Sequence, residues 1–135
     1  MANKDKVTSP KVARNASSLL REEVSLKAPK WTFEEYVLAL NLYLESDRGA
    51  VGKTSPKVQI LSQQMRALRP DIANNNPQFR SPSSVYLRLM NFRHLDSMNT
   101  GIGMSHVSQG CREIWEKFGN DRDRVAHLAT QILMT

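Results

Sequence analysis

Three helix N-termini are marked in this sequence, and apolar residues at helical spacing follow each of them. Thr32 and Glu35 match a capping box, in which a hydroxyl and a carboxylate three residues apart bond reciprocally to backbone amides. Ser55 and Ser81 each precede a proline, and serine at the N-cap followed by proline at the first helical position favours a helix start. These signals predict helices over residues 33–46, 56–69 and 82–94.

The apolar residues place one buried face on each of these helices. The predicted buried residues are Phe33, Val37, Leu40 and Leu44 in the first helix, Val58, Leu61, Met65 and Leu68 in the second, and Val85, Leu89 and Phe92 in the third. Two more helices are predicted around residues 110–118 and from Asp121 onward, and a short one around 16–26. Residues 71–78, rich in Asn and Pro, are expected to be a loop. The predicted fold is all-α, a compact five- to six-helix domain with little or no strand.

Positive charge is concentrated in the middle of the chain. The 135 residues carry a net charge of +6. Residues 48–95 hold eight Lys or Arg against a single acid, Asp71, and residues 1–30 hold seven against three acids. We therefore expect a basic N-terminal arm over 1–30, flexible in part or forming one short helix, and a helical domain over 31–135. A basic excess of this kind suits a nucleic-acid partner, although it also serves solubility.

Composition excludes several classes of protein. Cys111 is the only cysteine, so an intrachain disulfide and a cysteine-based zinc site are ruled out. No apolar run approaches the roughly 20 residues that cross a bilayer, and the N-terminus lacks the apolar segment of a signal peptide. The sequence therefore predicts a cytoplasmic chain with no membrane partner, no metal and no cofactor.

The predicted helix over 82–94 is the candidate site of nucleic-acid contact. A helix N-terminus attracts anions through its free amides and partial positive charge, and cations cluster around this one. Its outward face is predicted to carry Ser83, Leu87, Met90, Asn91 and His94. Leu87 can touch the methyl group of thymine or of methylated cytosine. The predicted phosphate-binding residues are Lys53, Lys57, Arg80, Ser81, Arg88 and Arg93, and the predicted base-reading residues are Ser83, Ser84, Tyr86, Leu87 and Asn91.

A pair of helices whose second member is short, capped and basic is typical of helix-turn-helix proteins, in which that second helix enters the major groove. The linker in this chain, residues 70–81, is longer than the roughly three or four residues of that motif. We therefore expect a helix-turn-helix-like pair. Reading a palindromic DNA site would favour a dimer, but the sequence shows no symmetric surface and leaves the oligomeric state open.

The order of several short motifs resembles the N-terminal domain of bacterial HNH-type restriction endonucleases, a family that includes enzymes directed at modified DNA. The motifs are WTxEE at 31–35, LALxLY at 38–43, SPxVxxLS at 55–62, NPxFRSPxSV at 76–85, LxNFxxLD at 89–96, GxG at 101–103 and IWxxF at 114–118. They span residues 31–133 with the terminal helix. Ser97 departs from the family's usual proline. The resemblance implies a domain that engages double-stranded DNA, methylated DNA being a candidate, and helps to select the target of a following HNH nuclease domain, which is absent from this chain.

Catalytic residues are not predicted in this chain. An HNH nuclease needs a His-based site that binds a divalent ion and activates water, and His94, His106 and His127 have no partner at fitting spacing. Cys111 beside an apolar stripe is more typical of a buried small residue than of a nucleophile. The expected function is that of a non-catalytic, DNA-binding target-recognition domain. The alternative is a protein-interaction or assembly module that uses the outward Tyr86, Leu87 and Met90.

Overall fold

The computed structural model describes residues 28–47, 51–96 and 107–135. Within these ranges all regular structure is helical, which confirms the predicted all-α fold: α3 (Phe33–Glu45), α4 (Pro56–Leu68), α5 (Pro70–Ala73), α6 (Pro82–Leu95), α7 (Gln109–Phe118) and α8 (Arg122–Met134). By their contacts, residues 28–30 and 70–79 belong to one compact unit and residues 31–47, 51–69, 80–96 and 107–135 to a second, larger one. The predicted helix around 16–26 and the glycine-containing turn at 101–103 lie outside the described residues. None of the described helices has the length and apolar character needed to span a bilayer.

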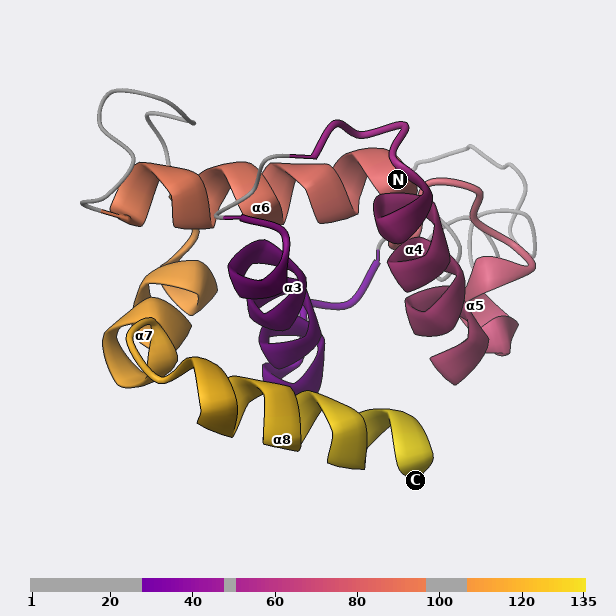
Figure 1. Ribbon diagram of the computed structural model, residues 1–135. Coiled ribbons are helices and arrows are strands. Elements are labelled where there is room, and N and C mark those ends of the chain that lie inside the picture. The colour runs from indigo at the N-terminus through magenta and orange to yellow at the C-terminus, as the bar shows by residue number, and fades with distance from the viewer. Residues whose placement is uncertain (1–27, 48–50, 97–106) are drawn as a thin grey trace, which may run out of the picture. The chain divides into compact units, whose positions relative to one another are not determined.

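Helix α3 is the centre of the larger unit. It contacts α4, α6, α7 and α8, and α6 and α8 lie on opposite sides of it (Figure 1). Eight of its 13 residues are buried, because a helix covered on several sides has little room for a polar face. The predicted stripe was therefore too narrow: Tyr43, which is not part of it, is fully buried, whereas Phe33, predicted in the stripe, is 45% exposed. In α4, Val58, Leu61 and Met65 are buried as predicted, but Leu68 is exposed.

The helix starts follow the sequence signals. At α3 both bonds of the capping box are present: the Glu35 N–H donates to Thr32 Oγ1 (3.1 Å) and the Thr32 N–H donates to Glu35 Oε1 (2.9 Å). Ser81 caps α6 by accepting the Ser84 N–H at 3.3 Å. Ser55 precedes α4 but forms no side-chain cap bond. The start of α4 is therefore marked mainly by Pro56 at its first position.

The segment predicted as a loop over 71–78 begins with a single helical turn. Helix α5 covers Pro70–Ala73, and the Asn74 N–H donates to the Pro70 carbonyl at 2.9 Å. The Asn75 side chain donates to the Asp71 carbonyl at 2.9 Å. The prediction was therefore wrong for residues 71–73. Pro70 favours a helix start, because proline is well suited to the first helical position. The loop prediction gave more weight to the three asparagines that follow.

An aromatic cluster joins α3, α6 and α7 inside the larger unit. The Tyr43 ring lies 6.1 Å from Phe92 and 5.9 Å from Trp115, and Phe92 lies 6.2 Å from Trp115, centroid to centroid. The buried Tyr43 hydroxyl donates to Asp96 Oδ2 at 2.6 Å. A buried phenol needs such a partner, and Asp96 is the C-cap residue of α6. The hydrogen bond therefore fixes the end of α6 to the central helix.

We expect Gly119→Ala to destabilise the larger unit by about 1–3 kcal/mol, the usual cost of overpacking. A Cβ at residue 119 would stand 2.6 Å from the Trp115 carbonyl oxygen and 2.7 Å from its ring, and neither the backbone nor a ring in the aromatic cluster can move aside easily. Gly52→Ala is the matched control, because a Cβ there meets nothing within 4 Å. Urea unfolding followed by circular dichroism measures both, and equal stability of the two variants would contradict the expectation.

Candidate nucleic-acid interface

The outward surface of α6 is narrower than the sequence predicted. Ser83, Leu87 and His94 are exposed, and this set is called the α6 ridge below. Asn91, predicted to read bases, is only 3% exposed. Its amide donates to the Leu87 carbonyl at 2.9 Å, and its Oδ1 accepts the Ser108 N–H at 2.9 Å. The prediction that Asn91 faces outward was therefore wrong, because the start of α7 covers it.

Met90 is also buried, at 8% exposure, against the prediction that it faces outward. Of the apolar surface expected for a protein-interaction module, Leu87 remains 42% exposed and Tyr86 is half-buried. Two side chains form a small apolar surface compared with the core of a protein interface. The α6 ridge thus combines a small hydroxyl, one aliphatic side chain and an imidazole.

Arg80 was predicted to bind phosphate, but its charge is already neutralised. Its guanidinium makes a two-pronged ion pair with Glu35, Nε to Oε2 at 2.8 Å and an Nη to Oε1 at 2.9 Å. Both side chains are buried, 3% and 6% exposed. The Arg80 carbonyl also accepts the Ser62 hydroxyl at 2.7 Å. The prediction for Arg80 was therefore wrong, and the residue ties the start of α3 and α4 to the entry of α6.

Arg88 is held differently, by an aromatic ring instead of a carboxylate. Its guanidinium carbon lies 4.7 Å from the centre of the Trp31 ring, and that of Arg80 lies 5.3 Å from the same ring. Arg88 Nε is buried without a hydrogen-bond partner, and Arg88 has no ion pair in the part of the chain that the structure describes. Trp31 therefore restricts the motion of a cation whose charge is not compensated. No local signal in the sequence indicates that Trp31 positions an arginine.

Arg93 lies on the other flank of the α6 ridge. Arg93 follows Arg88 by five positions, which at roughly 100° per residue places the two arginines about 140° apart across the buried face of the helix and about 220° apart across the ridge. Arg93 is half-buried, its Nε has no hydrogen-bond partner, and it has no ion pair among the described residues. The helix itself contains no acid. Each of the two cations thus lies roughly 100–120° around the helix from the centre of the ridge, one on either side, close to the edge of the buried face.

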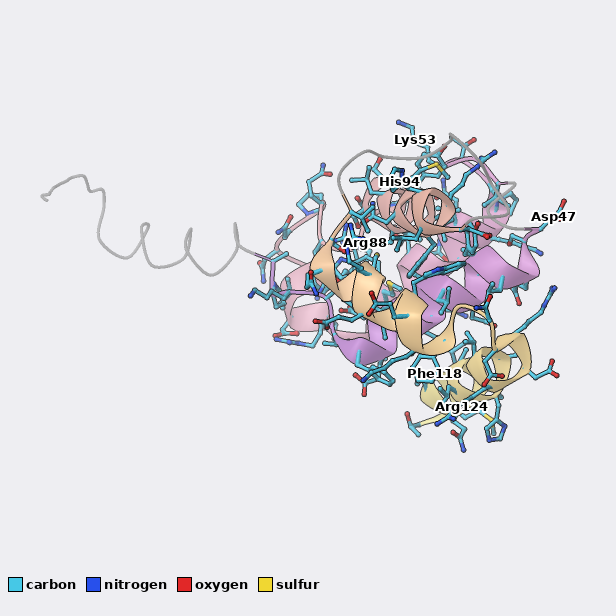
Figure 2. The ribbon with its side chains drawn as sticks, turned by 90° about the vertical axis from the view of Figure 1, so that its left-hand side faces the viewer. Asp47, Lys53, Arg88, His94, Phe118 and Arg124 are labelled. Atoms are coloured by element: carbon cyan, nitrogen blue, oxygen red, sulfur yellow. The ribbon has the colours of Figure 1, made fainter. Side chains whose placement is uncertain are left out.

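The two predicted lysines lie in different places. Lys53 is exposed, and Figure 2 shows it near the same edge of the view as His94, with Phe118 and Arg124 at the opposite edge. Lys57 instead lines a groove with Leu38 of α3 and Leu133 of α8. None of the ridge residues Ser83, Leu87 and His94 lines that groove.

The N-terminus of α6 offers an anion fewer amides than predicted. Pro82 has no N–H, the Ser84 N–H donates to the Ser81 hydroxyl, and the Val85 N–H donates to the Ser81 carbonyl at 3.0 Å. The Ser84 hydroxyl in turn donates to the Ser81 carbonyl at 3.0 Å. Ser81 therefore acts as the cap of α6, and the Ser83 amide is what the first turn leaves for a ligand in the described chain.

The described residues show no arrangement for catalysis around Cys111. The side chain is buried, and burial raises the pKa of the Cys111 thiol, an effect that its hydrogen bond to Ser108 and the charge of Arg88 only partly oppose. A raised pKa disfavours the reactive thiolate. No group of three or more His, Cys, Asp or Glu side chains within the described ranges could hold a metal ion.

No protein-family model, curated protein or solved structure shows significant similarity to this chain. The resemblance to the N-terminal domain of HNH-type restriction endonucleases therefore rests on the short motifs alone and stays a prediction.

Proposed function

We propose that this chain is the target-recognition domain of a restriction or defence endonuclease and binds double-stranded DNA through α6. In this proposal α4 and α6 form a helix-turn-helix-like pair, and α6 enters the major groove. Ser83 and Leu87 approach base edges, and Arg88, Arg93 and Lys53 contact phosphates. The nuclease domain that cuts the DNA is a separate part of the full enzyme, and this domain contributes no catalytic group.

The observation that carries this proposal is that the structure holds Arg80 and Arg88 through different partners. Arg80 is neutralised by Glu35, whereas Arg88 is stacked on Trp31 and keeps its full charge. A cation that is ordered before binding loses less conformational entropy when it binds. Phosphate is the ligand that an ordered guanidinium recognises well, because its planar donors match the phosphate oxygens.

The base-reading part of the proposal rests on the exposed Leu87 and Ser83. The side chain of Leu87 is 42% exposed on a helix that otherwise buries its large aliphatic residues at Val85 and Leu89. An apolar group facing the major groove contacts the C5 methyl group of a pyrimidine. The proposal therefore includes 5-methylcytosine as a candidate mark, with Leu87 as the side chain that senses it.

The test is a fluorescence-anisotropy titration of two matched duplexes, one unmodified and one carrying 5-methylcytosine, over a series of salt concentrations. Each phosphate that is neutralised contributes about −0.9 to the slope of log K against log salt. Three cations therefore predict a slope of roughly −3, with tighter binding to the modified duplex if Leu87 reads the methyl group. Absence of binding to either duplex at low salt would refute the proposal and favour the protein-interaction alternative.

A further inference from the structure

A groove of about 250 Å³ lies between α3, α4 and α8, all in the larger unit. Leu38, Leu42 and Leu61 line it and are buried, whereas Ile60 and Leu133 line it and are 52% and 45% exposed. Exposed aliphatic side chains beside a hollow that is partly apolar are typical of a surface that contacts another protein. None of the residues of the α6 ridge lines this groove.

The polar side chains of the groove have no partners among the residues that the structure describes. Asn41, Glu45, Lys57 and Gln64 line it, and none of these side chains forms a hydrogen bond or an ion pair in the described part of the structure. Glu45 and Lys57 thus lie on the same groove without pairing with each other. The groove offers one acid, one base and two amides to whatever covers it.

We propose that this groove is a two-fold interface between two copies of the chain. A two-fold interface brings the same patch of both copies together, so the patch must complement itself. This groove meets that condition in charge, because Glu45 of one copy faces Lys57 of the other and the reverse pair forms as well. The exposed Ile60 and Leu133, which line the groove, supply the apolar surface that the second copy covers. A partner of another kind would need no such balance of one acid and one base.

The test is sedimentation equilibrium of the full chain without DNA. Wild-type protein is expected to dimerise. Lys57→Glu places an acid opposite Glu45 of the second copy at both ends of the interface, and Glu45→Lys places two bases together, so each is expected to raise the dimer dissociation constant by about tenfold or more. The combined variant Glu45→Lys with Lys57→Glu exchanges the two charges and is expected to restore dimerisation.

Lys117→Glu is the matched control, because Lys117 is exposed on α7 and does not line the groove. Lys117→Glu changes the net charge by the same amount as Lys57→Glu and is expected to leave the dimer intact. Circular dichroism verifies that each variant is folded. A monomeric wild type, undiminished dimerisation of both single variants, or a combined variant that stays monomeric would each overturn the proposal. Because no DNA is present, these outcomes do not depend on the proposed function.

Discussion

Arg80→Ala is expected to destabilise the larger unit by about 3–5 kcal/mol, the usual cost of removing one partner of a buried ion pair. The Glu35 carboxylate would stay buried, at 6% exposure, with the Thr32 amide as its remaining neighbour in the capping box. The loss of the cation also removes one of the two guanidinium groups on the Trp31 ring. Urea unfolding followed by circular dichroism measures the effect.

Further substitutions separate the ion pair from the backbone at this position. The φ angle of Arg80 is 45°, a left-handed conformation that glycine adopts without penalty. Arg80→Gly is therefore expected to be about 1 kcal/mol more stable than Arg80→Ala, although both lose the ion pair. Arg80→Lys keeps a charge but not the two-pronged geometry, so it should fall between Arg80→Ala and wild type.

The control for these variants is Arg112→Ala, which removes an exposed arginine of α7 that has no partner among the described residues. It is expected to change stability by no more than about 0.5 kcal/mol, as surface substitutions usually do. If Arg80→Ala were as mild as Arg112→Ala, the pair with Glu35 would not be what holds α3 to the entry of α6.

The helices of this protein were predictable because their start signals are local. The capping box of Thr32 and Glu35 and the serine cap of α6 each involve residues three apart, so the sequence contains the whole interaction. Glu35 shows which contacts such local signals do not reveal. One of its roles, in the cap, was predicted, but its pairing with Arg80 joins residues 45 positions apart, and nothing local indicates which arginine reaches it.

The same limit explains the errors at the candidate site. A helical wheel places Asn91 on the outward face of α6, and only the later Ser108, whose amide Asn91 accepts, reveals that the start of α7 covers it. Likewise, nothing local in the sequence indicates that Lys57 lines the groove between α3, α4 and α8. Exposure of Ser83 and Leu87 was predicted correctly, because no other element in the described ranges covers that part of the helix.

Arg88→Ala is expected to weaken binding to double-stranded DNA by about tenfold or more, which corresponds to one lost charge-assisted hydrogen bond of about 1.5 kcal/mol. The slope of log K against log salt is expected to fall in magnitude by roughly 1, because one phosphate contact disappears. Arg88→Lys keeps the charge and so should keep most of the slope, but it should lose affinity because an ammonium group stacks less well on Trp31 and cannot bind phosphate with two donors. Fluorescence anisotropy on one duplex over the salt series measures both quantities.

Arg124→Ala is a closely matched control, because Arg124 also stacks on an aromatic ring, its guanidinium carbon lying 5.4 Å from the centre of Phe118. The substitution removes the same charge and the same kind of contact from α8, on the other side of α3 from α6 (Figures 1 and 2). If binding depends only on the net charge of the chain, the two variants will weaken it equally, and α6 loses its assigned role. If Arg88→Ala weakens binding and Arg124→Ala does not, the DNA lies along the side of the unit on which Trp31 orients Arg88.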